Sequence, residues 1–221
     1  MGTAIIVLGG HRSGTSCVAG IIHRLGVPLG EHLLGPGVGN PVGHFEDLEF
    51  YHLHRLILGE NRDPKAWRYP RPNLDAFRGP YKALVDLRNQ THPRWAVKDP
   101  RLCFTLPLLL ESHPGEVRTV RVHRDPRKSA QSLAAREGDL SLQDAEAIAW
   151  SYHRAAQEAA ELAIARGPAL HLHFDYVIGN PRQAVEELAR FLLVPPSEMN
   201  DRVQSAVKSI NPSLNHWGPS E

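Results

Sequence analysis

The sequence predicts an α/β fold in which a central parallel β-sheet carries helices. Short apolar segments alternate along the chain with helical patterns, as is typical of βαβ units. The first apolar segment, residues 4–8, leads into a glycine-framed turn and then a helical pattern over residues 14–25. This order of strand, turn and helix is that of a phosphate-binding loop. We see no repeat and no interior domain boundary, so we expect one domain over residues 1–221.

Four segments are predicted strands because they are short and apolar and are bounded by turn residues. The third remains a strand prediction although Arg118 and Arg121 interrupt its apolar residues. The predicted strands are residues 4–8, 95–97, 117–122 and 169–174.

The predicted helices carry apolar residues at helical spacing, and two of them show start signals. Asn73 is a candidate N-cap, and Pro126 stands in a first turn, where proline is tolerated. The Gly- and Pro-rich connection over residues 26–43 is a predicted lid or substrate wall. The predicted helices are residues 14–25, 45–58, 73–90, 102–110, 126–136, 141–166 and 181–192; a turn-rich connection covers 59–72, and no element is assigned after Val194.

Composition excludes several classes of protein. Hydrophobic content of 42% and charged content of 22% are those of a soluble globular protein. A net charge of +1 gives no reason to expect nucleic-acid binding, so an anion site must come from local clustering of Arg and Lys. No run reaches the ~20 apolar residues of a membrane span, and the N-terminus lacks a signal peptide's basic region. We therefore expect a cytoplasmic protein.

Cysteine, tryptophan and histidine residues receive structural assignments. Cys17 and Cys103 lie in apolar stretches and are predicted to be buried, reduced thiols. Trp67 and Trp150 are predicted core residues. His171 and His173 share a strand face, but no third ligand stands at a recognisable spacing, so we expect no metal site.

The turn after the first strand departs from an ordinary nucleotide-triphosphate loop at one position. Gly9, Gly14 and Ser16 occupy the places that G-x-x-x-x-G-K-[ST] requires, but Thr15 replaces the lysine. Backbone N–H groups of the loop and the helix start can still cradle a phosphate. The missing lysine argues against an ordinary ATP or GTP enzyme.

A second anion-binding pattern follows the third strand. Arg124 stands where that strand ends, and Ser132 lies two helical turns into the next helix. Ligands of open α/β sheets bind at the carboxyl ends of strands, where a guanidinium can grip a phosphate. A solvated, basic helix start is the alternative interpretation.

Taken together, these motifs resemble the sulfotransferase family that uses 3′-phosphoadenosine-5′-phosphosulfate (PAPS). The resemblance runs from about Ile5 to Val194, and four motifs occur in the family's order. They are the 5′-phosphosulfate loop Gly9 to Ser16, the K-D-P element Lys98-Asp99-Pro100, the 3′-phosphate motif Arg124-Asp125-Pro126-Arg127 with Ser132, and the late segment Phe174-Asp175-Tyr176-Val177. The late segment departs from the family's Y-E-D-L at Phe174 and Tyr176.

The resemblance implies a P-loop-type three-layer α/β/α fold and a metal-free transfer of sulfonate from PAPS, leaving 3′-phosphoadenosine-5′-phosphate (PAP). Arg12 and Lys98 would stabilise charge on the bridging and leaving oxygens. Arg124 and Ser132 would hold the 3′-phosphate. The residues expected to bind the 5′-phosphosulfate are Gly10, His11, Arg12, Ser13, Gly14, Thr15 and Ser16.

The acceptor must lose a proton, and several residues are candidate bases. Glu46 is the first choice, because it follows the Gly/Pro loop at a predicted helix start, where the tyrosylprotein-type members carry a catalytic glutamate. His44 is the second, since histidine is the base of the family's cytosolic branch. Glu46 has the alternative role of a helix-start glutamate, and Lys98 with Asp99 that of a structural ion pair. The remaining candidates are Asp47, Asp99 and His123.

Two other functions stay open at this point. One is a P-loop kinase or nucleotide-binding regulatory module with a degenerate Walker A loop, and the other is a non-enzymatic module that binds PAP. The acceptor of a sulfotransferase would be a small molecule, a carbohydrate or a natural product carrying a hydroxyl or amine. Because the chain is short for the family, we expect an open, shallow acceptor site.

Overall fold

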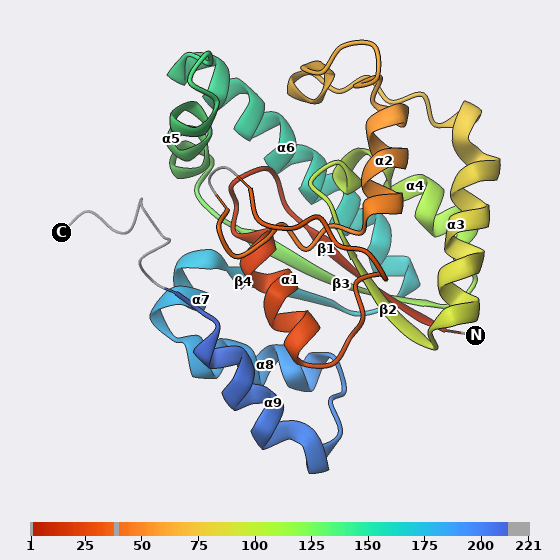
Figure 1. The fold of residues 1–221 in the computed structure, drawn as a ribbon, viewed down its shortest axis with the longest axis vertical. Coiled ribbons are helices and arrows are strands. Elements are labelled where there is room, and N and C mark those ends of the chain that lie inside the picture. Colours follow the sequence, from red (N-terminus) through yellow and green to blue (C-terminus); the bar gives the residue numbers. More distant parts are fainter. Residues whose placement is uncertain (1, 38–39, 212–221) are drawn as a thin grey trace.

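The computed structural model describes residues 2–37 and 40–211 and has a four-stranded parallel sheet at its centre (Figure 1). The strand order is β2-β1-β3-β4. All three strand pairs are parallel, and Val7 of β1 lies beside both Lys98 of β2 and Val120 of β3. The strands are β1 (Thr3–Leu8), β2 (Arg94–Lys98), β3 (Glu116–His123) and β4 (Ala169–His173). Each predicted strand is therefore confirmed to within one residue at either end.

Helices cover both faces of the sheet and complete the predicted three-layer α/β architecture (Figure 1). Ile5 and Val7 of β1 pack into a core with α1, α7, α8 and α9, whereas Ala4, Ile6 and Leu8 pack into a core with α2, α3, α4 and α6. Both faces of β1 are buried, as its unbroken apolar run requires. The helices are α1 (Thr15–Arg24), α2 (Leu48–Ile57), α3 (Arg78–Thr91), α4 (Leu102–Ser112), α5 (Pro126–Glu137), α6 (Leu142–Ala163), α7 (Phe174–Gly179), α8 (Pro181–Phe191) and α9 (Pro196–Lys208).

Most predicted helix starts agree with the structure to within one residue, and those of α2 and α3 do not. Asp125 accepts a hydrogen bond from the Arg127 N–H ahead of Pro126, and Ser141 caps α6 through the Asp144 N–H. The predicted Asn73 N-cap is wrong, because α3 begins only at Arg78. The Asn73 side chain instead accepts a 3.4 Å bond from the Ala76 N–H, ahead of a short 3₁₀ turn.

The predicted helix start at residue 45 is also wrong, with a consequence for the site. Asp47 is the N-cap of α2, and its carboxylate accepts a hydrogen bond from the Glu49 N–H. Phe45 has a left-handed backbone, with φ of 56°, which is incompatible with a helix. Glu46 therefore lies in the connection before α2 rather than in its first turn.

The second half of the chain holds two helices that the sequence analysis did not assign. Helix α7 begins at Phe174, which was predicted as the last residue of a strand. Helix α9 occupies the stretch after Val194, with Pro196 in its first turn and Glu198 near its positive end. None of the helices in the described ranges is long and apolar enough to cross a membrane.

The cysteine and tryptophan predictions are each right for one residue. Cys103 is buried as predicted, but Cys17 is only half-buried; both are free thiols. Burial raises the pKa of Cys17 to about 11 and that of Cys103 to about 12, so neither is a reactive thiolate. Trp67 is a core residue at 7% exposure, whereas the prediction for Trp150 is wrong, because 42% of that residue is exposed.

The two tryptophans should therefore differ sharply in their effect on stability. Trp67→Ala removes a buried ring that packs with α5 and α6, and we expect a loss of about 3–5 kcal/mol in the free energy of unfolding. Trp150→Ala removes a ring with a large exposed fraction and should cost less than about 1 kcal/mol. Urea unfolding of both variants measures the difference, and equal losses would show that the core does not include Trp67.

Candidate active site

A glycine-framed loop at the carboxyl end of β1 opens directly into α1. Gly14 is the N-cap of α1 with φ of 92°, and a Cβ there would run into the Phe174 ring, so both the backbone and the space require glycine. The Ser13 hydroxyl closes the loop by donating to the Gly10 carbonyl at 2.7 Å. Within the described part of the chain, no side chain caps α1 and its first turn holds no acidic residue. The N–H groups of that turn are thus suited to an anion.

Three arginines gather beside this loop, and we call Arg12, Arg124 and Arg136 the arginine cluster. Arg12 Nε donates to Ser132 Oγ at 2.9 Å, and Arg124 Nη1 donates to the Arg12 carbonyl at 2.8 Å. Burial, with the like charges of Arg136 and Arg124, lowers the pKa of Arg12 to about 10. An anion bound among these guanidinium groups would relieve both the desolvation and the repulsion. The arrangement is therefore chemically fitted to phosphate.

Arg136 is the member of the cluster that the sequence analysis missed. It lies one helical turn beyond Ser132 on α5, so the spacing of four residues was the available signal. Its guanidinium lies 5.9 Å from the centre of the Trp67 ring and pairs with Glu137 at 2.6 Å. The ring and the carboxylate hold Arg136 at the edge of the same cavity that Arg12 and Arg124 line.

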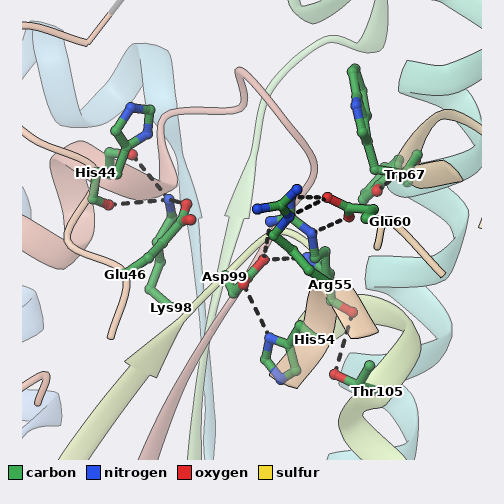
Figure 2. Close-up of polar contacts among 12 residues, drawn as sticks. His44, Glu46, His54, Arg55, Glu60, Trp67, Lys98, Asp99 and Thr105 are labelled. Atoms are coloured by element: carbon green, nitrogen blue, oxygen red, sulfur yellow. Dashed lines mark hydrogen bonds and ion pairs between the residues drawn. The ribbon is translucent and has the colours of Figure 1, made fainter. Parts of the chain in front are cut away.

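A buried ion pair between Glu46 and Lys98 lies at the carboxyl end of β2 (Figure 2). Lys98 Nζ is 2.6 Å from Glu46 Oε1, 3.1 Å from Ser16 Oγ and 3.2 Å from the His44 carbonyl oxygen. Lys98 and Glu46 are only 3% and 4% exposed. The alternative of a Lys98–Asp99 pair is wrong, because Asp99 pairs with Arg101 and His54 instead.

The surroundings reverse the usual order of basicity between Glu46 and His44. Burial raises the pKa of Glu46 above its ordinary 4.5; Lys98 opposes that shift, and the Asp99 charge adds to it. Burial, with the positive charges of Lys98, Arg136 and Arg12, lowers the pKa of His44 to about 4. Glu46 is therefore the stronger base of the two, although a free histidine is stronger than a free glutamate.

A cavity of about 410 Å³ joins the loop, the arginine cluster and the Glu46–Lys98 pair. Asn40 to Gly43, from the connection predicted as a substrate wall, form part of its lining, and Ser209 and Asn211 reach it from beyond α9. The predicted site residues that line it are His11, Arg12, Gly14, Thr15, Ser16, His44, Glu46, Lys98 and Arg124.

The other predicted binding residues, Gly10, Ser13 and Ser132, do not line this cavity. Gly10 and Ser13 border a separate space of only about 20 Å³, and Ser132 contacts the site through Arg12. The His11 imidazole packs against Trp67 and Tyr152, with ring centres 4.7 and 4.8 Å away. Burial lowers the pKa of His11 well below its usual value, so this ring is neutral.

The remaining candidate bases do not line the cavity. Asp47 caps α2 and pairs with Arg88, and Asp99 is buried with Arg101 and His54. His123 Nε2 lies 2.9 Å from His171 Nδ1 at the β4 edge of the sheet. None of the three is among the cavity's lining residues in the described chain. Over the same residues, no group of three or more His, Cys, Asp and Glu side chains is arranged to hold a metal ion.

Comparison with solved structures relates this fold to sulfotransferases. The sulfotransferase domain of the olefin synthase from Synechococcus PCC 7002 has a TM-score of 0.56 at 17% identity, covering 97% of this chain and 86% of that one. Sulfotransferase STF9 from Mycobacterium avium has a TM-score of 0.59 at 15% identity, with coverages of 98% and 72%. Sulfotransferase STF1 from Mycobacterium tuberculosis H37Rv has a TM-score of 0.58 at 12% identity, with coverages of 97% and 75%.

No protein-family model and no curated protein matches the chain by sequence. The similarity is thus one of fold, and the chain has the three-layer α/β fold that these sulfotransferases share.

Proposed function

We propose that this protein is a sulfotransferase that moves the sulfonate group of PAPS to a hydroxyl or amine of a small-molecule, carbohydrate or natural-product acceptor. The observation that carries the proposal is the single cavity that joins a phosphate loop and three arginines to a buried glutamate–lysine pair. The shared fold supports it independently.

The residues fit the two phosphate positions of PAPS. The uncapped N-terminus of α1, with Thr15 and Ser16, would receive the 5′-phosphosulfate. Arg124 and Ser132 would hold the 3′-phosphate, and Arg12 would lie between the two positions because it already contacts Ser132. The lowered pKa of Arg12 supports this assignment, since crowded guanidinium groups gain most from a bound anion.

PAPS supplies an activated sulfonate whose S–O bond to the 5′-phosphate breaks as the acceptor's oxygen or nitrogen bonds to sulfur. Glu46 would take the acceptor's proton on a carboxylate oxygen. Lys98, already within hydrogen-bond distance of Ser16 and Glu46, would stabilise the negative charge that remains on the departing phosphate oxygen. Arg12 and the first turn of α1 would share that charge.

Arg124→Ala should weaken PAP binding much more than binding of adenosine-5′-phosphosulfate, because only PAP carries a 3′-phosphate. A hydrogen bond to a charged group contributes about 1.5–3 kcal/mol, which is about ten- to 150-fold in the dissociation constant. Isothermal titration calorimetry measures both constants. Arg182→Ala is the matched control: this exposed arginine of α8 pairs with Glu186 and is not among the residues that line the cavity, so its loss should leave both constants unchanged.

The same titrations separate this proposal from its rivals. Equal losses for the two ligands in Arg124→Ala would refute the 3′-phosphate assignment. Tight ATP binding that depends on Mg²⁺, with weak PAP binding, would identify a kinase or nucleotide-binding regulator instead. PAP binding without turnover in an acceptor screen would identify a non-enzymatic module.

A further inference from the structure

A network of buried ionisable side chains lies beside the Glu46–Lys98 pair (Figure 2). Its members are His54, Glu60, Asp99 and Arg101, and none is more than 6% exposed. Asp99 Oδ1 is 3.1 Å from Arg101 Nη1, and Asp99 Oδ2 is 3.1 Å from His54 Nδ1. Arg101 donates two further bonds to Glu60, at 2.5 and 2.9 Å.

Burying this network costs more free energy than burying apolar residues of equal volume would. Removing a carboxylate or guanidinium from water costs several kcal/mol, and a buried ion pair often stabilises a fold no better than apolar residues of equal volume. Phe50, Leu102 and Leu106, which lie within five residues of His54 or Arg101 in the sequence, are buried apolar residues of the core. Perturbed ionisable groups beside a cleft are candidates for a role in the chemistry of that cleft.

Asp99 is the member of the network that connects it to the site. It follows Lys98 at the end of β2, and its Oδ1 also accepts the Arg101 N–H at 2.8 Å, which closes the turn into α4. Pro100 inside that turn lines the cavity. Resting on the proposed function, we propose that Asp99 is a positioning residue: through Arg101 and His54 it fixes the turn after Lys98, and thereby the place of the Lys98 ammonium against Glu46.

His54 holds the second oxygen of Asp99 with a defined ring orientation. Its Nδ1 faces Asp99, and its Nε2 lies 3.1 Å from the Tyr81 hydroxyl. The 3.1 Å contact is close in distance without the alignment of a hydrogen bond, and we assign the ring proton to Nδ1 because a carboxylate only accepts. An asparagine at position 54 would place an amide N–H near the Nδ1 position, whereas a glutamine would place one near Nε2. These two substitutions therefore separate the contact to Asp99 from mere occupancy of the space.

The charge of Asp99 also acts on Glu46. The charged groups that face Glu46 are Lys98 and Arg101, which lower its pKa, and Asp99, which raises it. Burial by itself would raise the pKa of Asp99, but Arg101 and His54 hold that pKa well below its usual value, so Asp99 stays ionised. Replacing Asp99 by neutral asparagine should consequently lower the pKa of Glu46 and move the acid limb of a kcat–pH profile to lower pH.

The experiment combines turnover with a direct titration of Glu46. Asp99→Asn should lower kcat by about 100-fold while PAP affinity stays near normal, because a misplaced catalytic group costs rate rather than binding. Titration of ¹³C-labelled glutamate carboxyls by NMR, with Glu46→Gln assigning the signal, should show the Glu46 midpoint at lower pH than in the native protein. His54→Asn should retain at least about tenfold more of kcat than His54→Gln, the ratio expected for one charged hydrogen bond.

A buried histidine at the opposite end of the strands supplies the matched control. His113 is 1% exposed, lies 3.2 Å from the Glu116 carbonyl and packs against Trp95 at the amino end of β2, so His113→Gln perturbs the core at the end of the strands away from Lys98. It should change neither the Glu46 titration nor kcat. An unchanged Glu46 midpoint in Asp99→Asn, or equal kcat in the two His54 variants, would overturn the inference while turnover by the native protein upholds the proposed function. A shifted Glu46 midpoint in Asp99→Asn, found together with no turnover by the native protein, would uphold the effect of Asp99 on Glu46 and refute the proposed function.

Discussion

Glu46→Gln should lower kcat by about 10²–10⁴-fold while leaving the affinity for PAP near normal. Glutamine keeps the shape of the side chain and can still accept a hydrogen bond from Lys98, but it cannot take a proton. Glu46 is 4% exposed and lies 2.6 Å from Lys98, so the change is confined to the reacting edge of the cavity. Steady-state turnover with PAPS, together with calorimetry of PAP, measures the two effects separately.

Glu49→Gln is the control for this prediction. Glu49 lies three residues further on, its side chain is 54% exposed, and it pairs with Arg88, so the same chemical change there should leave kcat unaltered. A normal rate in Glu46→Gln would move the general base to His44. The low pKa of His44, about 4, makes that the weaker assignment, because a base so easily deprotonated has little driving force to take a proton.

The sequence analysis succeeded where local chemistry determines structure. Apolar runs bounded by turn residues located all four strands, and Asp125 with Pro126 located the start of α5. The loop was predictable for the same reason, since Gly9 and Gly14 frame the turn between the first apolar run and the helix, and Gly14 has the left-handed backbone that favours glycine. Such signals depend on neighbouring residues and are readable without knowing the tertiary fold.

The sequence analysis failed where contacts between residues far apart in the sequence determine the structure. Phe45 takes a left-handed backbone, and Glu46 leaves the predicted helix to meet Lys98, 52 residues away. The network of His54, Glu60, Asp99 and Arg101 joins segments that no spacing rule connects. Phe174 and Val177 suit a strand by propensity, yet they form α7, where Phe174 packs against Gly14 and lies 5.2 Å from the Arg124 guanidinium.

Lys98→Met should remove most of the turnover and also destabilise the protein. Loss of a preorganised cation at the departing oxygen costs about 10²–10³-fold in kcat. Glu46 would also remain buried without its ion-pair partner, and breaking a buried pair in this way costs about 3–5 kcal/mol of unfolding free energy. Because the pKa of Glu46 in the folded variant would then lie far above its unfolded value, stability should be highest at low pH and fall as the pH rises through that pKa.

The double variant Lys98→Met with Glu46→Gln tests whether the lost stability comes from the uncompensated charge of Glu46 rather than from altered packing at position 98. It leaves no uncompensated charge, so it should recover most of the lost stability and show no comparable decline with rising pH, yet it should remain as inactive as either single change. Urea unfolding between pH 5 and 8 and turnover on the same preparations provide both readouts. Recovery of stability without recovery of rate is the result that only a functional ion pair produces. A Lys98→Met protein with native turnover would show that the ammonium serves packing alone and would return the stabilisation of the departing oxygen to Arg12 and the first turn of α1.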